Sequence, residues 1–327
     1  VNAKEIFFTS GGTESDNLAL IGCARANRRA GNHLITTSIE HPAILNTMRY
    51  LEEEEGFRVT YLPVDQYGRI RLDALKEALC EDTILVSIMY VNNEVGTVQP
   101  VEEAASIVKD YNPSILFHSD AVQGFGKYRI YPKRQKIDLL SVSGHKIHGP
   151  KGIGFLYIDE KVKIRPLIYG GGQQKDMRSG TENVAGIIGL ATAADIAVNT
   201  LHYRMEKEWN IQRYMAERIV NEIPYTSING NMTGRVSGNI NICFKGISAG
   251  ELVLLLDKQG ICVSSGSACH GNHGGPSHVL KAIGKTDEES LASIRLTFNH
   301  TLNQNQADYC IDCIKKNVAA LRKIKND

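Results

Sequence analysis

Five polar side chains in this sequence each follow an apolar run, at positions where buried strands are expected to end. They are Thr13, His41, Asn93, Asp120 and Lys146. In open α/β sheets, ligands bind beyond the carboxyl ends of the strands, so these side chains are candidates for one shared site. Each has an ordinary structural explanation when taken alone, and only their conjunction indicates chemistry.

The turn Ser10-Gly11-Gly12-Thr13 stands between a predicted strand and a predicted helix. Backbone N–H groups at a helix N-terminus, together with the Thr13 hydroxyl, can hold an anion such as a phosphate. An ordinary glycine turn with Thr13 as helix cap explains the same residues and is the more common case. The turn is not a Walker loop, and no Gly-x-Gly-x-x-Gly follows the first strand, which disfavours a nicotinamide enzyme.

Asp120 and Lys146 are the acidic and the basic residue among these strand-end side chains. Asp120 ends the run 115–120, where a deep carboxylate suits a protonated ring nitrogen, although a helix cap is an equally good explanation. Lys146 follows the apolar run 139–143 and is expected to be buried. Burial lowers the pKa of a lysine and makes its amine available for imine formation. His41 could stack on an aromatic cofactor, although a lone histidine is more often structural. A phosphate cradle, a deep carboxylate and a buried lysine together predict pyridoxal phosphate (PLP), held on Lys146 as a Schiff base.

The glycine-rich run 262–275 predicts a flexible loop that exposes Cys269. An exposed thiol on such a loop favours a reactive role, whereas Cys243 and Cys262, with apolar neighbours, are expected to be buried. Metal ligation by Cys269, His270, His273 and His278 is the minor alternative, because a second Cys/His pair is missing. Cys310 and Cys313 fall inside a predicted helix and are interpreted as structural.

Arg295 lies on a predicted strand between apolar residues. A guanidinium in such a place is suited to bind a substrate carboxylate through two parallel hydrogen bonds. An ordinary surface arginine explains it equally well.

The composition describes an ordinary globular chain of 327 residues, in which 37 Lys and Arg nearly balance 36 Asp and Glu. This balance gives no reason to expect nucleic acid or a membrane surface as partner. Seven scattered cysteines indicate reduced thiols and a cytoplasmic protein. The longest apolar stretch, 185–198, is too short to cross a bilayer and is expected to be a core helix. The chain opens directly into a strand without an initiator Met or a signal peptide, so we expect a fragment.

Short β-branched runs alternate with helical patterns as far as residue 200. The predicted strands are 6–9, 34–37, 59–62, 84–91, 115–119, 139–143 and 154–158. This alternation predicts an α/β fold with a mainly parallel, doubly wound sheet in a large domain, 1–200. The remainder, 201–327, reads as a smaller α+β C-terminal domain with helices at 201–223, 250–258 and 305–324 and strands at 239–244 and 294–297.

Several motifs in this order resemble the cysteine desulfurases of the NifS/IscS type, within the class V aminotransferase group of PLP enzymes. The resemblance covers nearly the whole chain. It rests on Phe8 to Asn17, Glu40-His41, Val91 to Gly96, Asp120-Ala121-Val122-Gln123, Ser143 to Gly154, Met177 to Thr181 and Ser264 to Cys269. The implied fold is the PLP-dependent transferase fold type I.

The resemblance also implies a role for each matching residue. Lys146 would carry the cofactor, Asp120 would pair with the ring nitrogen, and His41 would stack on the ring. Gln123 would contact the phenolic oxygen, and Asn93 and Arg295 would bind the substrate carboxylate, with Asn93 also near the cofactor. The phosphate would be held by Gly12, Thr13, Ser143 and His145, with Thr181 contributed by the other subunit of a homodimer. Gly144 would be a further cofactor-binding residue.

The activity implied by this resemblance is removal of sulfur from L-cysteine, which leaves alanine and a persulfide on Cys269. The persulfide would pass to an acceptor protein, for iron–sulfur clusters or for tRNA and cofactor thiolation. A related PLP lyase or aminotransferase, such as a selenocysteine lyase, is an alternative. A third possibility is an inactive scaffold, because family members carry several dozen residues before the position of Val1.

Overall fold

We describe the protein from a computed structural model, in which residues 1–265 and 275–326 are described. The chain forms two compact units. The first comprises residues 1–64, 69–92 and 99–200, and the second comprises 65–68, 93–98 and the chain from 201 onward. The sequence suggests the division at residue 200, but it gives no sign that the segments 65–68 and 93–98 belong to the second unit.

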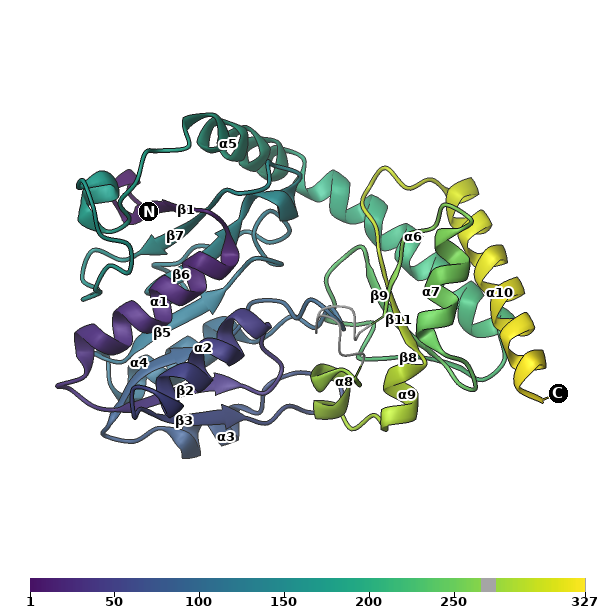
Figure 1. Cartoon of the computed structure of the whole chain (residues 1–327), viewed down its shortest axis with the longest axis horizontal. Helices are drawn as coiled ribbons and strands as arrows, with labels where there is room; N and C mark the ends of the chain where they lie inside the picture. Colours follow the sequence, from purple (N-terminus) through teal and green to yellow (C-terminus); the bar gives the residue numbers. More distant parts are fainter. Residues whose placement is uncertain (266–274, 327) are drawn as a thin grey trace. The chain divides into compact units, whose positions relative to one another are not determined.

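The first unit is built on a seven-stranded sheet with the strand order β1-β7-β6-β5-β4-β2-β3 (Figure 1). The strands are β1 (Ile6–Thr9), β2 (His33–Thr37), β3 (Arg58–Leu62), β4 (Thr83–Ser87), β5 (Leu116–Asp120), β6 (Leu139–Ser143) and β7 (Gly154–Ile158). Successive neighbours from β3 to β6 are parallel, and β7 runs antiparallel to β6 and β1. The expected mainly parallel α/β architecture is thereby confirmed.

Five α-helices of the first unit connect or flank these strands. They are α1 (Gly12–Asn27), α2 (Pro42–Glu53), α3 (Leu72–Ala78), α4 (Val101–Tyr111) and α5 (Val184–Asn199), and short 3₁₀ turns η1 (Ala3–Glu5), η2 (Gly144–Ile147) and η3 (Gln173–Asp176) complete the described elements. Apolar side chains of α1 and α2, such as Leu20 and Met48, pack with Leu34 of β2 and Leu156 of β7 in one buried cluster. Burial of these side chains fixes α1, whose first turn then reaches the carboxyl end of the sheet.

The second unit contains an antiparallel four-stranded sheet in the order β10-β11-β9-β8. Its strands are β8 (Thr226–Ile228), β9 (Asn239–Phe244), β10 (Ser264–Ser265) and β11 (Ser293–Thr297). Its helices are α6 (Leu201–Glu222), α7 (Ala249–Asp257), α8 (His278–Ala282), α9 (Asp287–Leu291) and α10 (Gln304–Asn326). Ile219, Ile242, Leu252 and Ile311 bring α6, β9, α7 and α10 into one apolar core.

Two expectations about these elements are wrong. The strand expected over 84–91 ends at Ser87, after which Ile88 and Tyr90 still donate backbone hydrogen bonds to the β5 carbonyls without continuing the ladder. The helix expected in the core, α5, instead exposes 62% of Ile188 and 55% of Ile196. Its apolar composition was therefore a poor guide to its burial within a single chain.

No single helix in the described part of the chain is long and apolar enough to cross a membrane, although the broken pair α5 and α6 passes that test by length and composition.

Candidate active site

The N-terminus of α1 is the candidate anion-binding feature of the first unit. Gly11 occupies the N-cap position, and no side chain in the described residues caps the helix there. A Cβ atom placed on Gly12 would lie 2.7 Å from Val122 Cγ2, so the first turn already fits tightly against its surroundings. The N–H groups at Gly12 and Thr13 therefore begin a helix end that is suited to an anion.

Ser143 and His145 lie beside this helix end. A Cβ atom on Gly11 would be 3.5 Å from Ser143 Oγ, which places the end of β6 against the start of α1. Ser143 Oγ is 2.9 Å from His145 Nδ1, and Gly144 donates its N–H to the Ile153 carbonyl at 2.9 Å. Partial burial, and then the charge of Lys146, lower the pKa of His145, so its imidazole is neutral at neutral pH. The predicted phosphate-binding residues of this strand end are thus brought together.

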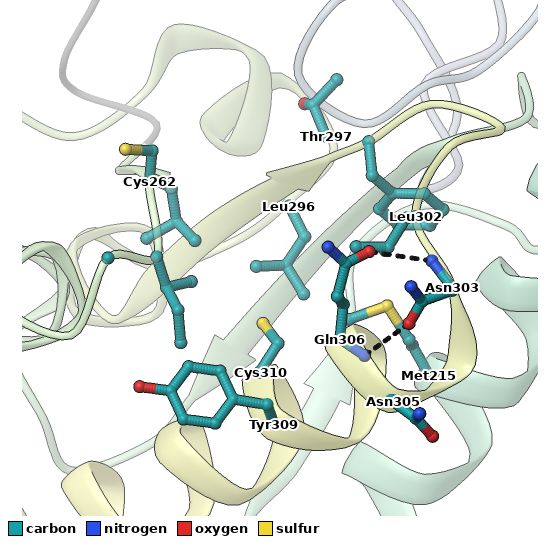
Figure 2. Close-up of a pocket in the computed structure, with 14 residues that line it drawn as sticks. Met215, Cys262, Leu296, Thr297, Leu302, Asn303, Asn305, Gln306, Tyr309 and Cys310 are labelled. Carbon is teal, nitrogen blue, oxygen red and sulfur yellow. Dashed lines mark hydrogen bonds between the residues drawn. The ribbon is translucent and has the colours of Figure 1, made fainter.

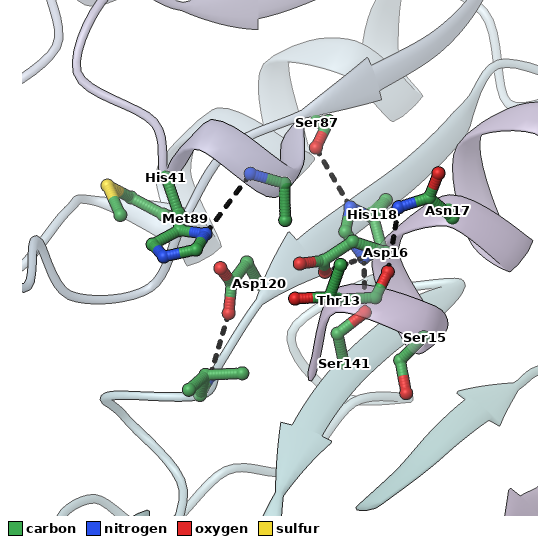
Figure 3. Close-up of polar contacts among 12 residues, drawn as sticks. Thr13, Ser15, Asp16, Asn17, His41, Ser87, Met89, His118, Asp120 and Ser141 are labelled. Atoms are coloured by element: carbon green, nitrogen blue, oxygen red, sulfur yellow. Dashed lines mark hydrogen bonds and ion pairs between the residues drawn. The ribbon is translucent and has the colours of Figure 1, made fainter. Parts of the chain in front are cut away.

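Asp120 ends β5, next to β6, and is 6% exposed. Burial raises the pKa of its carboxyl to about 6, against the opposing effects of the Val122 N–H, which Oδ1 accepts at 2.9 Å, and of the Lys146 ammonium. Lys146 is therefore close enough to act on Asp120 electrostatically. Figure 3 shows the Asp120 carboxyl in the region between the His41 ring and the first turn of α1, which carries Thr13.

A buried polar network beside Asp120 was not predicted from the sequence. His118, two residues earlier on β5, has Nδ1 2.8 Å from Ser87 Oγ, Nε2 2.9 Å from Ser141 Oγ and Nε2 3.7 Å from Asp16 Oδ1 (Figure 3). Burial lowers the pKa of His118 to about 3, and burial together with the Asp120 charge raises that of Asp16 well above its usual range. Burial therefore disfavours the charged form of both Asp16 and His118. The alternation of side chains along a strand, which places residues 118 and 120 on one face, is the signal that could have revealed it.

Glu40 is a second buried carboxyl that sequence reasoning did not interpret. Its Oε1 accepts hydrogen bonds from the Met89 N–H at 2.9 Å and from the Thr37 hydroxyl at 2.8 Å. Burial raises its pKa to about 8, so the group is mostly protonated at neutral pH. Its contacts join the ends of β2 and β4 just before His41.

His41 is the N-cap of α2, and its Nδ1 accepts the Ala43 N–H at 3.1 Å. This hydrogen bond gives His41 a structural role as a helix cap and holds its ring in one orientation. The predicted stacking on a cofactor is compatible with that role. Gln123 is half-buried in the turn that follows Asp120. Thr181 is exposed and lines a hollow of about 60 Å³ together with Ser10 and Gly152.

The prediction that Lys146 is buried is wrong for this chain. Lys146 lies in the η2 turn, is classed as exposed, and follows the fully buried strand β6. The turn carries its side chain out of the sheet, so the cost of burying a cation cannot be the argument for its role. Its electrostatic link to Asp120 is the better argument.

Asn93 and Arg295 are brought together in the second unit. Arg295 Nη1 donates to the Asn93 carbonyl oxygen at 3.0 Å, and Arg295 Nε is buried without a hydrogen-bond partner among the described residues. The side-chain amides of Asn239 and Asn241 donate to the carbonyls of Asn93 and Glu94 at 3.4 and 3.2 Å. The segment 93–98 therefore owes its place to β9 and β11.

Cys269, His270 and His273 lie outside the described residues. Cys243 is buried as expected, but Cys262 is exposed, because it precedes the short strand β10 and is not part of the core. Among residues 1–265 and 275–326, no group of three or more His, Cys, Asp and Glu side chains is arranged to hold a metal.

The second unit contains a hollow of about 530 Å³ between α10, α6 and the chain before β10 (Figure 2). Met215, Leu296 and Leu302 line it, with Gln306, Tyr309 and Cys310 at its polar side. It contains none of the predicted site residues, and its size alone gives it no chemistry.

The family model for class-V aminotransferases matches residues 1–309. The chain belongs to the class-V aminotransferase family. A relative from Clostridium botulinum named cysteine desulfurase IscS is 45% identical over 323 residues, which are 98% of this chain and 81% of that protein. A solved structure titled NifS-like protein is 39% identical with a TM-score of 0.92, over 98% of this chain and 84% of that one. Another solved structure, titled SspA in complex with cysteine, is 38% identical with a TM-score of 0.78, and the match covers 90% of this chain and 81% of that one.

Class-V aminotransferases use pyridoxal phosphate, and the residues of this chain fit that group. The uncapped start of α1 and Ser143 offer donors to a phosphate, Asp120 offers a buried carboxyl to a ring nitrogen, and Lys146 offers an accessible amine near that carboxyl. The start of α1 follows β1, Asp120 ends β5, and Ser143 ends β6, so these features lie at the carboxyl edge of one sheet, where ligands bind in α/β folds.

Proposed function

We propose that this chain is a PLP-dependent cysteine desulfurase that takes sulfur from L-cysteine and leaves alanine. The observation that carries the proposal is the buried Asp120 carboxyl at the end of β5, beside the neighbouring strand β6 that leads into the Lys146 turn and near an uncapped helix N-terminus. Bound PLP supplies an electron sink for an amino acid that has lost its α-proton. The relatives named cysteine desulfurase support cysteine as the amino acid, as does the solved relative titled as a cysteine complex.

The cofactor-binding residues each have a part that follows from their environment. Gly12, Thr13, Ser143 and His145 would hold the phosphate, with a neutral His145 that can accept or donate one proton, and Gly144 would be a further cofactor-binding residue. Asp120 would keep the ring nitrogen protonated, His41 would stack on the ring, and Gln123 would contact the phenolic oxygen. Thr181 contributes to the phosphate site of a second subunit.

Lys146 is the residue that would hold the cofactor and would accept and return the α-proton. Its exposure leaves the side chain accessible to an incoming amino acid. The proximity of Asp120 and His145 provides a carboxylate and a neutral imidazole around that amine.

Substrate carboxylate binding is assigned to Arg295 together with Asn93. The guanidinium is fixed by one hydrogen bond to the Asn93 carbonyl, and its buried Nε has no hydrogen-bond partner among the described residues. A donor left in this state favours an acceptor such as a carboxylate. Cys269, which lies outside the described residues, is assigned as the thiol that attacks the substrate sulfur.

The decisive experiment measures alanine and sulfide released from L-cysteine with PLP added, alongside Lys146→Ala and Cys269→Ser. We expect Lys146→Ala to lose both the visible absorbance of bound PLP and the products. Cys269→Ser should keep the absorbance and lose sulfur release. A Cys269→Ser protein that retains most of its rate would support a selenocysteine lyase or aminotransferase instead. An unaltered protein that shows no PLP absorbance would overturn the proposal and leave the scaffold alternative.

We further propose that the chain acts as a cytoplasmic homodimer and passes its sulfur to an acceptor protein. The six described cysteines are free, in keeping with a reducing compartment. The exposed apolar face of α5, formed by Val184, Ile188 and Ile196, has the character of a covered surface. The names of the relatives give no acceptor, so a cluster scaffold and a thiolation enzyme remain equal candidates.

A further inference from the structure

A cluster of polar side chains surrounds the thiol of Cys80, away from the candidate active site but within the first unit. Cys80 follows α3 and is partly exposed. Its Sγ is 3.1 Å from Arg58 Nη2, 3.3 Å from His33 Nδ1 and 3.4 Å from Thr83 Oγ1. These three residues begin β3, β2 and β4, which are neighbours in the sheet. The Cys80 cluster therefore lies at the amino ends of the strands, opposite to the end that carries the cofactor-binding residues.

The hydrogen bonds of the Cys80 cluster direct donors toward the sulfur. Burial, and then the Arg58 charge, lower the pKa of His33 to about 4, so its imidazole is neutral. Its Nε2 is 2.8 Å from the Thr60 hydroxyl and its Nδ1 is 2.8 Å from Thr83 Oγ1. Thr83 Oγ1 accepts the Cys80 N–H at 3.0 Å and lies 3.4 Å from the Cys80 sulfur, where its hydroxyl can donate to a thiolate.

Arg58 adds a permanent positive charge beside the same sulfur. A thiolate next to a guanidinium is favoured over the neutral thiol, and the thiolate is the nucleophile. Partial burial opposes ionisation, but the hydrogen bonds from Thr83 and Arg58 outweigh it and hold the pKa of Cys80 below its ordinary value of 9.0.

Other described thiols lack this environment. Cys262 is more exposed, and the group nearest its Sγ in the hydrogen-bond network is a carboxylate oxygen of Asp257 at 4.0 Å, not a guanidinium. Cys23 and Cys243 are buried, and burial raises the pKa of each. Exposure alone would rank Cys262 as more reactive than Cys80, whereas electrostatics gives the reverse order.

We propose that Cys80 is a modification site that undergoes exchange with low-molecular-weight disulfides through the donors supplied by Arg58 and Thr83. The Cys80 thiolate attacks one sulfur of the disulfide, and a new Sγ–S bond forms as the original S–S bond breaks. The second half of the reagent leaves as a thiolate and takes a proton from solvent. Cys80 is thereby oxidised and the departing half is reduced, so electrons balance without a further reactant.

The test uses the full chain with PLP bound and glutathione disulfide as the probe. Residue-resolved mass spectrometry follows mixed-disulfide formation at each cysteine from about pH 6 to about pH 9. We expect Cys80 to react faster than Cys262 near neutral pH, with a rate that rises at lower pH than that of Cys262. Equal or slower reaction at Cys80, or the same pH profile for both thiols, would overturn the proposal.

Variants at Arg58 isolate the source of the effect. Arg58→Gln should slow the Cys80 reaction about three- to tenfold at neutral pH, and Arg58→Lys should restore most of the rate because the charge returns. Arg71→Gln is a matched control, since Arg71 is an exposed arginine that pairs with Asp73 and not with a thiol. An Arg58→Gln protein that reacts like the unaltered chain would contradict the assignment, and the measurement on the unaltered chain stands even if a variant does not fold.

Discussion

Arg295 and Asn93 are joined by a hydrogen bond of 3.0 Å although 202 residues separate them in the sequence. The contact places the two predicted carboxylate-binding residues in one compact unit. Arg295 occupies the middle of β11, between β10 and β9, and pairs with Ser264 and Asn241. The strand that holds Arg295 therefore pairs with β10, which precedes Cys269 in the sequence.

The first prediction concerns Arg295 as a binder of the substrate carboxylate. Arg295→Lys removes the parallel pair of N–H donors and leaves a single ammonium. Loss of a buried charge-assisted contact costs about 2 kcal/mol or more, so the KM for L-cysteine should rise at least about tenfold. Steady-state rates of alanine release measure the KM, and the absorbance of bound PLP should equal that of the unaltered chain.

Arg322→Lys provides the control for that substitution. Arg322 also donates to a backbone carbonyl, that of Lys245 at 3.0 Å, but it has no assigned role in the site. Its KM should match that of the unaltered chain. If Arg295→Lys left the KM within about twofold, the assignment to substrate binding would be wrong.

The second prediction follows from the raised pKa of Asp120. Its carboxyl titrates at about 6 in the folded chain against an ordinary value of 3.8. An ionised Asp120 favours a protonated cofactor ring, so PLP affinity should fall as the pH drops through about 6. Asp120→Asn should bind PLP more weakly and lose this part of the pH dependence. Absorbance titrations of PLP binding to both proteins across this pH range test the prediction, and an equal fall in affinity through about pH 6 in the two would contradict it.

In the chain without PLP, the raised pKa of Asp120 stabilises the fold at low pH, whereas PLP binding is expected to weaken at low pH. Because the folded-state pKa is the higher one, the native state binds the proton more tightly, and this contribution is complete below about pH 3.8. It is lost as the pH rises through about 6. In Asp120→Asn, the free energy of unfolding should not show this decrease between about pH 4 and about pH 6. An identical pH profile of stability for both proteins would argue against the raised pKa of Asp120.

The third prediction concerns the exposed apolar face of α5. Val184, Ile188 and Ile196 stand at intervals of four or eight residues and therefore share one side of the helix. Ile188→Asp should leave the fold of the subunit intact, because the side chain is 62% exposed, and should dissociate the proposed dimer. Analytical ultracentrifugation measures the change. Leu254→Asp, an equally exposed apolar position on α7, should leave the dimer unchanged, and dissociation by both or neither would count against α5.

The features of the fold that could be predicted are those that depend on local sequence patterns. The strands β6 and β9 were predicted with their observed ends because β-branched and apolar runs there are bounded by polar or glycine residues. Polar residues after such runs, notably Asp120, then fell together at the carboxyl edge of the sheet. Periodicity and strand-end position were sufficient for these features.

The features that escaped prediction depend on contacts made far along the chain. The segment 93–98 belongs to the second unit because Arg235 and Asn241, which lie well over a hundred residues later, pack and bond against it. The apolar side chains of α5 at Val184, Ile188 and Ile196 are exposed and do not lie in the core of this chain. Lys146 is exposed because a single 3₁₀ turn redirects it, which the preceding apolar strand does not reveal.

The last prediction tests how closely the phosphate cradle is built onto the sheet. A Cβ atom on Gly154 would lie 2.4 Å from the Val142 carbonyl oxygen and 2.7 Å from Gly11 Cα, so Gly154→Ala must displace β7 or the start of α1. We expect a loss of about 1–3 kcal/mol in the free energy of unfolding and weaker PLP binding, because the anion-binding turn moves. Denaturant unfolding and PLP absorbance measure the two effects. Gly250→Ala, in the first turn of α7 with only Ser248 Oγ at 3.7 Å, should be neutral or slightly stabilising. A Gly154→Ala protein as stable as the unaltered chain, with unchanged PLP affinity, would show that the cradle tolerates displacement of this strand.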